Sequence, residues 1–171
     1  INFAALKSLP VLFVCENNLY SVYSPLGVRQ SPSRKNHLLA ESLGIQAGGG
    51  LDGNDASTVY EAAKKAIDSV RSGDGPYFLE FNTYRWLEHC GPSYDNDIGY
   101  RTEDEFQDWK QRDPLEILGE RLEVQQPGCK DFKETERGKF QAEVSTAISF
   151  AKKAPFPKEQ ALSRDVYANQ G

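Results

Sequence analysis

The sequence predicts an α/β domain with a parallel sheet. Two short apolar segments, residues 9–15 and 76–83, have the composition of strands, and a helical pattern lies between them at residues 59–70. The order strand, helix, strand is typical of parallel units with right-handed crossovers. Such sheets carry their active sites outside the carboxyl ends of the strands.

The N-terminal elements are predicted from apolar runs and the breaks between them. Residues 3–8 have the pattern of the last turns of a helix, and the continuous apolar run at 9–15 is typical of a strand buried on both faces. Residues 20–36 are polar, contain two prolines and a glycine, and are predicted to form a loop. A short helix is expected at 38–43, ending at Gly44.

A weak strand, a helix and a clear strand follow. Residues 45–51 form a possible strand that three consecutive glycines dilute, and residues 52–55 supply a turn and a helix N-cap. Gly73 suits the C-cap of the helix, and residues 76–83 alternate as a strand does. Five apolar residues share one face of the helix: Val59, Ala63, Ala66, Ile67 and Val70.

The last part of the chain is predicted to be helical. Thr102 and Glu105 form a capping-box pattern ahead of one helix. Asp113-Pro114 combines an N-cap with a proline at the first helical position of the next. After a break, a long helix is expected at about 132–151.

Composition excludes several classes of protein. The chain has 20 Lys and Arg against 25 Asp and Glu, a net charge of −5 without a basic stripe, which argues against nucleic-acid binding. No apolar run approaches the ~20 residues needed to cross a bilayer. The three cysteines lack paired spacing, which fits a reducing compartment, and two histidines are too few for a typical zinc site. The chain contains no methionine, and we expect it to be part of a longer protein.

Candidate site residues follow the predicted strands. Segments 16–20, 52–55 and 84–90 are expected to line one cleft. In the first, a carboxamide oxygen and a main-chain carbonyl are the kind of neutral oxygen ligands that suit Mg²⁺. The alternative is that the Asn-Asn pair only forms a turn after the strand.

His89 is the second candidate. It follows a strand end, where an imidazole could donate a hydrogen bond to a phosphate or move protons near neutral pH. The alternative is a histidine that merely lies on the surface. A nucleophilic pair with Cys90 is disfavoured, because adjacent residues cannot easily present their side chains to each other.

Six segments share an order and spacing with a known family: residues 11–21, 51–55, 75–80, 83–85, 100–102 and 112–114. In this respect the chain resembles the α subunit of the thiamine-diphosphate-dependent 2-oxoacid dehydrogenases, the E1 components of the pyruvate and branched-chain complexes. The long C-terminal helix and the tail at 165–168 are similar too.

The resemblance implies a three-layer thiamine-diphosphate-binding fold. Residues 1–124 would be the C-terminal half of that α/β domain, and residues 125–171 a helical extension packed on it. The family's cofactor motif begins with Gly-Asp-Gly and ends in Asn-Asn, and only its closing half is present here. By resemblance, Asn18 and Tyr20 bind Mg²⁺, Asn18 and His89 contact the cofactor, and His89 assists acylation of a lipoyl group.

The implied activity is oxidative decarboxylation of a 2-oxo acid with acyl transfer to a lipoyl group. The implied partners are an E1-β subunit or fused equivalent and a lipoyl-bearing E2, in an α2β2 or dimeric assembly in the bacterial cytoplasm. Cys90 stands where mitochondrial relatives carry a phosphorylatable serine, which argues against kinase control there. The alternatives are a transketolase-like or acetoin-cleaving enzyme, and a non-catalytic α/β interaction module.

Overall fold

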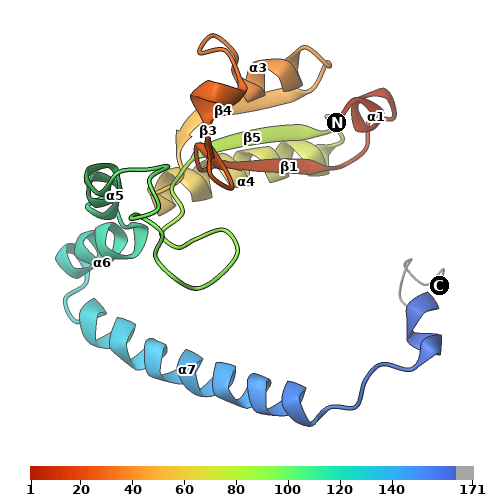
Figure 1. Ribbon diagram of the computed structural model, residues 1–171. Helices are drawn as coiled ribbons and strands as arrows, with labels where there is room; N and C mark the ends of the chain where they lie inside the picture. Colours follow the sequence, from red (N-terminus) through yellow and green to blue (C-terminus); the bar gives the residue numbers. More distant parts are fainter. Residues whose placement is uncertain (165–171) are drawn as a thin grey trace. The chain divides into compact units, whose positions relative to one another are not determined.

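The computed structural model describes residues 1–164 (Figure 1). The chain divides into two compact units, Ile1–Arg121 and Leu122–Gly171. This division lies within helix α6 (Pro114–Gln125), three residues before the boundary at 124/125 expected from the sequence. Packing of the C-terminal extension on the domain stays a prediction. The tail at 165–168 lies outside the described residues.

The first unit is built on a parallel three-stranded sheet, as predicted. Its strands are β1 (Leu12–Asn17), β4 (Gln46–Asp52) and β5 (Tyr77–Asn82), in the order β1-β5-β4. Asn17 of β1 and Asp52 of β4 are both in register with Asn82 of β5. The three strands therefore end in one row of polar residues, at the edge where active sites of parallel sheets lie.

Helices cover both faces of this sheet, which confirms the layered α/β class. Figure 1 shows α4 (Ala56–Ser72) on one side of β5 and α3 (Asn36–Glu41) on the other. One apolar cluster joins α4 to β5 through Ala66, Val70, Tyr77, Leu79 and Phe81, and a second joins α3 to the opposite face through Ala40, Ile45 and Phe78. Alternate side chains of β5 thus enter two cores.

The burial predicted for the first strand is wrong. Val14 in β1 is 55% exposed, whereas residues 77–81 of β5 are all buried. Within residues 1–164, β1 pairs with β5 alone and forms an edge of the sheet, while β5 lies at its centre. A continuous apolar run does not distinguish these two positions, because strand order is set by tertiary pairing.

The caps predicted for the main helix are confirmed. The Asp55 carboxylate accepts a hydrogen bond from the Ser57 backbone N–H at 3.1 Å, which satisfies a free donor at the start of α4. Gly73 ends the helix with φ +91°, a left-handed conformation that glycine adopts without steric cost. The amphipathic segment and its capping residues therefore agree.

The predicted loop at 20–36 contains regular structure and is wrong in that respect. A small antiparallel hairpin pairs β2 (Tyr20–Ser21) with β3 (Ser24–Pro25), and the short helix α2 (Leu26–Arg29) follows. Leu19 and Val22 adopt positive φ values of 68° and 55°. Non-glycine residues seldom do so, and the sequence therefore carries no usual signal for this turn.

Short helices precede and follow the sheet. Helix α1 (Asn2–Leu6) leads into β1, and α5 (Glu103–Lys110) follows β5 after a long connection. The Thr102 hydroxyl accepts a hydrogen bond from the Glu105 backbone N–H at 3.1 Å, which confirms the predicted cap of α5. Asp113 accepts from the Leu115 N–H at 2.9 Å at the start of α6, also as predicted.

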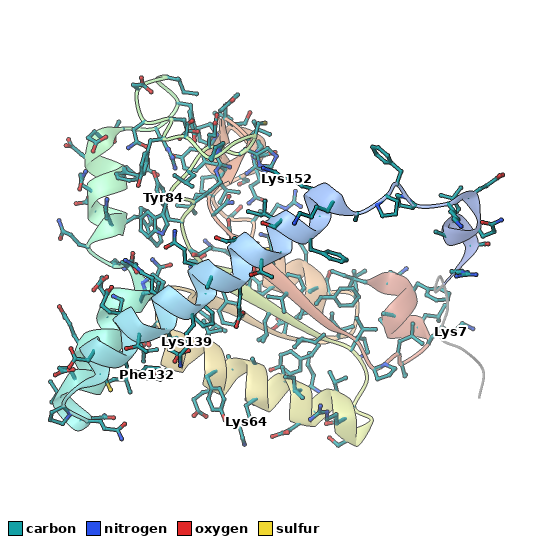
Figure 2. All side chains as sticks on the ribbon, turned by 90° about the horizontal axis from the view of Figure 1, so that it is seen from below. Lys7, Lys64, Tyr84, Phe132, Lys139 and Lys152 are labelled. Carbon is teal, nitrogen blue, oxygen red and sulfur yellow. The ribbon has the colours of Figure 1, made fainter. Side chains whose placement is uncertain are left out.

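The second unit is mainly one helix. Helix α7 (Cys129–Lys153) begins after Gly128, which has φ +101°, and a 3-10 turn, η1 (Glu159–Ser163), follows. The helix is longer at both ends than the segment 132–151 predicted. Figure 2 labels Phe132, Lys139 and Lys152 along it. None of the helices within residues 1–164 has the length and apolar character that crossing a membrane requires.

Candidate functional site

A pocket of about 540 Å³ lies at the carboxyl ends of the strands. Segments 16–20 and 52–55 both contribute to it, as predicted, but no residue of segment 84–90 does, so the single cleft expected from three segments is wrong. Its lining residues are Asn17, Leu19, Leu26, Gln30, Arg34, Lys35, Asn36, His37, Gly50, Leu51, Asp52, Glu80, Asn82, Trp109 and Arg112.

Glu80 of β5 is the buried charged group of this pocket, with 5% of its surface exposed. One carboxylate oxygen accepts from the side-chain amides of Asn17 and Asn36 at 2.9 and 2.8 Å. The other oxygen lies 3.2 Å from the backbone N–H of His37 and 3.0 Å from its Nδ1. We call these four residues the Glu80 cluster. Burial raises the pKa of Glu80, but the hydrogen bonds from His37, Asn17 and Asn36 outweigh it and hold the pKa below its ordinary value.

The glycine run of β4 makes room for His37. A Cβ atom placed on Gly49 would overlap the imidazole ring, so glycine at this position is what allows the ring to lie against the strand. In the sequence, the three glycines at 48–50 indicated only a weakened strand. Neither Glu80 nor His37 was predicted as a site residue, and an acidic residue within an apolar strand was the only signal.

Asn17 and Asn18 form two successive side-chain turns. The Asn17 side-chain oxygen accepts from the Leu19 N–H at 3.2 Å, and that of Asn18 accepts from the Tyr20 N–H at 3.1 Å. This is the turn chemistry that the sequence offered as the alternative to metal binding. The two roles are compatible, because an amide oxygen has two lone pairs and the turn uses one.

The hairpin directs the Tyr20 carbonyl toward the side occupied by the Asn18 oxygen. The Leu26 N–H donates to the Leu19 carbonyl at 2.7 Å, so the adjacent Tyr20–Pro25 pair is of the non-hydrogen-bonded type. The N–H and C=O of Tyr20 then both point away from β3. Since this N–H points to the Asn18 oxygen, the Tyr20 carbonyl and the Asn18 oxygen face the same side.

The phenol of Tyr20 anchors this hairpin to α5. Its hydroxyl donates to the Glu105 carboxylate, with both oxygens at 2.7–2.8 Å, and its ring meets the Tyr100 ring edge-on with centroids 5.3 Å apart. Burial and the hydrogen bond to Glu105 raise the pKa of Tyr20. The hydroxyl therefore stays protonated at neutral pH.

Buried Arg101 organises the connection between β5 and α5. Its guanidinium donates to the Arg85 and Trp86 carbonyls at 2.6 and 3.1 Å and pairs with the carboxylate of Asp95. It also lies 5.0 Å from the centroid of the Tyr84 ring, which Figure 2 labels. These contacts tie residues 84–86 to residues 95–101. We call Tyr84, Arg85, Trp86, Asp95 and Arg101 the Arg101 cluster.

Arg85 links the same connection to the hairpin. Its guanidinium donates to the Val22 carbonyl at 3.2 Å and to the Tyr100 hydroxyl at 2.9 Å. His89 lies farther along this connection, and its side chain is exposed and does not line the pocket. The neighbouring Cys90 is also exposed. The structure thus brings Asn18 and Tyr20 together and attaches the segment that carries His89 to their hairpin.

The donors present fit a hard cation better than a soft one. Within the described residues, no group of three or more His, Cys, Asp or Glu side chains is arranged to hold a metal ion. The pair at the hairpin consists instead of an amide oxygen and a main-chain carbonyl. Both are hard neutral donors of the kind Mg²⁺ accepts alongside carboxylates, phosphates and water.

Comparison with known proteins identifies the family of the chain. A family model described as the dehydrogenase E1 component matches residues 1–160. A pyruvate dehydrogenase E1 component subunit alpha from Rickettsia felis is 36% identical over 167 residues, which are 97% of this chain and 49% of the relative. The mitochondrial pyruvate dehydrogenase E1 component subunit alpha of Dictyostelium discoideum is 34% identical over 174 residues, 99% of this chain and 44% of the relative.

A relative with a different named substrate is almost as similar. The 2-oxoisovalerate dehydrogenase subunit alpha of Bacillus subtilis is 33% identical over 168 residues, 98% of this chain and 49% of the relative. The chain therefore spans about half the length of the curated relatives it matches. Together with the parallel sheet and the Asn-Asn turn, the match over nearly all of the chain shows that it is an E1-α member of the dehydrogenase E1 component family.

Proposed function

We propose that this chain belongs to the α subunit of a thiamine-diphosphate- and Mg²⁺-dependent 2-oxoacid dehydrogenase. The names of its relatives support the enzyme class, and two different 2-oxo acids among those names leave the acyl donor open. The partners we propose are an E1-β subunit or fused equivalent and a lipoyl-bearing E2, in an α2β2 or dimeric assembly. The bacterial cytoplasm stays the predicted location.

One observation carries the proposal for the site: the Asn18 side-chain oxygen and the Tyr20 carbonyl face the same side of the hairpin. These two atoms would bind Mg²⁺ together with donors outside the described residues. Because both are uncharged, the ion keeps its positive charge and can hold a diphosphate. When bound, thiamine diphosphate supplies the electron sink for decarboxylation.

Three further residues, Glu105, Arg85 and His89, have proposed roles near this hairpin. Glu105 keeps the phenol of Tyr20 in place and so positions its main-chain carbonyl. Arg85 connects the hairpin to the segment that carries His89. We propose that His89 closes over the diphosphate end of the cofactor and assists acyl transfer to the lipoyl group, since imidazole can donate a proton near neutral pH.

A matched pair of variants tests the metal site. Asn17 and Asn18 make equivalent turn hydrogen bonds, but only Asn18 is a proposed ligand. Asn17 also donates to Glu80, so its variant controls for loss of the turn together with that contact. In the purified protein with its β partner, Asn18→Ala should weaken Mg²⁺-dependent binding of thiamine diphosphate at least tenfold by calorimetry. Asn17→Ala should weaken it much less.

Equal losses in the two variants would show that Asn18 acts only as a turn residue. Unchanged affinity in Asn18→Ala would remove it from the site altogether. Turnover of a panel of 2-oxo acids, with and without a lipoylated acceptor, then tests the reaction. Turnover without any need for the lipoyl group would point to the transketolase-like or acetoin-cleaving alternative.

A further inference from the structure

The pocket at the strand ends contains features that the proposed cofactor site does not use. Asn18, Tyr20 and His89 are not among its lining residues. Its volume of about 540 Å³ is within the range of small-molecule sites, and its lining is mainly polar and charged, with three leucines and Trp109 as the large apolar side chains. The question is which ligand chemistry these polar groups would recognise.

The acidic groups of the pocket are already matched by donors. Glu80 receives hydrogen bonds from three residues of its own cluster. Asp52 accepts from the guanidinium of Arg112 at 2.9 Å. Both carboxylates therefore already have hydrogen-bond donors, and the charge of Asp52 is paired with that of Arg112.

Two cationic side chains of the pocket, Arg34 and Lys35, have no acidic partner in the described part of the chain. The side chains of Arg34 and Lys35 line the pocket, and neither makes a hydrogen bond or ion pair with any residue in the described part of the chain. Because they are adjacent in sequence and line one concave surface, their positive potentials add there. Guanidinium and ammonium groups with free donors bind carboxylates and phosphates.

His37 adds an oriented polar group to the same wall. Its Nδ1 is held by the Glu80 carboxylate at 3.0 Å, which fixes the plane of the ring. Its Nε2 has no hydrogen-bond partner within residues 1–164, and the side chain keeps 22% of its surface exposed. A ring nitrogen oriented by a buried carboxylate on its far side is an arrangement typical of ligand-binding histidines.

We propose that this pocket is a second binding site, for a small metabolite that carries a carboxylate or phosphate group. Arg34 and Lys35 bind the anionic group, and His37 Nε2 contacts a polar atom of the same ligand. The leucine side chains and Trp109 that line the pocket cover its apolar part.

Charge-removing variants test the proposal in the purified protein with its β partner. Arg34→Gln/Lys35→Gln removes both cations, and both side chains are exposed, so folding should not suffer. The matched control is Lys152→Gln/Lys153→Gln, an adjacent exposed pair at the end of α7 with the same loss of charge. The probes are inorganic phosphate and malonate, titrated by calorimetry without Mg²⁺ so that the proposed cofactor site stays inactive.

We expect saturable binding of at least one probe, weakened tenfold or more by Arg34→Gln/Lys35→Gln and unchanged by the control pair. Preference for phosphate would assign a phosphorylated ligand, and preference for malonate a carboxylic acid. In wild-type protein, the His37 ring signals in NMR spectra should shift with the same probe. Absence of saturable binding, or equal losses in the two double variants, would overturn the proposal.

The test of this second site can be distinguished from the test of the cofactor site. Arg34→Gln/Lys35→Gln should leave Mg²⁺-dependent binding of thiamine diphosphate unchanged, whereas Asn18→Ala should leave binding of the anionic probe unchanged. If the double variant weakened cofactor binding instead of probe binding, the pocket would belong to the cofactor site and the second site would be refuted.

Discussion

The Glu80 cluster and the Arg101 cluster bury charges of opposite sign in different ways. Glu80 lies on the central strand, and its carboxylate is held by two neutral amides, a backbone N–H and an imidazole. Arg101 lies in the connection between β5 and α5 and is paired with a full negative charge on Asp95, whose side chain is 3% exposed. Both clusters connect to the hairpin that follows Asn18. The Glu80 cluster does so through Asn17, and the Arg101 cluster through Arg85, which donates to the Val22 carbonyl.

The difference teaches how each charge depends on its partners. A carboxylate held by neutral donors loses hydrogen bonds when it is neutralised, but it leaves no other charge stranded. A buried ion pair behaves differently, because removing one member leaves the other as an uncompensated charge in the interior. The Arg101 cluster should therefore be the more sensitive of the two to substitution.

The largest loss is expected from Arg101→Met. This change leaves buried Asp95 with only the more distant guanidinium of Arg85, 3.9 Å away, as a cation. It also removes the donors to the Arg85 and Trp86 carbonyls. We expect the free energy of unfolding to fall by about 3–5 kcal/mol, measured by urea denaturation. The double variant Arg101→Met/Asp95→Asn should recover part of that loss. A single-variant loss below about 1 kcal/mol would contradict the asymmetry between the clusters.

A smaller loss with a distinct pH signature is expected from Glu80→Gln. The amide keeps the size of the side chain but presents an NH2 group to donors, so one pair of hydrogen bonds is lost at a cost of about 1–3 kcal/mol. The pKa of Glu80 is lowered in the folded protein, so its carboxylate stabilises the fold at pH values above its ordinary 4.5.

That contribution is lost as the pH falls from the ordinary value through the folded pKa. Denaturation measured between about pH 3 and 7 should show wild type losing stability on the acid side more steeply than Glu80→Gln. If the free energy of unfolding fell equally steeply with decreasing pH in the two proteins, the donors around Glu80 would not favour its ionised form.

The smallest effect on stability is expected from His89→Ala, because this side chain is exposed and belongs to neither cluster. The thermal midpoint should not change measurably. Under the proposed function, transfer of the acyl group to the lipoyl acceptor should fall more than decarboxylation does. Cys90→Ala is the matched control and should change neither partial reaction, and equal losses in both reactions for His89→Ala would refute its role in acyl transfer.

Local patterns were the reliable guide to the helices and strands. The caps at Asp55, Gly73 and Thr102 form through contacts within a few residues, so they can be recognised in the sequence. The hairpin after β1 was missed because its left-handed residues, Leu19 and Val22, are not the types that usually signal such turns. The edge position that β1 has within residues 1–164 was missed because an apolar run does not reveal strand order.

The candidate site divides in the same way. The family resemblance implied the role of the Tyr20 carbonyl, and the Asn-Asn turn was predicted because it follows a strand directly. The Glu80 cluster was not, since its partners lie 43, 44 and 63 residues away in the sequence. The anchor from Tyr20 to Glu105 joins residues 85 positions apart, and no local pattern reports such a pairing.

The sequence by itself determined the α/β class, the parallel unit, the helix caps and the family, because periodicity, capping and motif order are carried by residues near one another in the chain. Only the tertiary structure decided that β5 is central and that a carboxylate is buried beside His37. It also decided that the pocket is lined by two cations that have no partner in the described part of the chain. Those features arise when the ends of parallel strands bring distant segments to one edge of a sheet, where burial makes each polar group depend on partners from elsewhere in the chain.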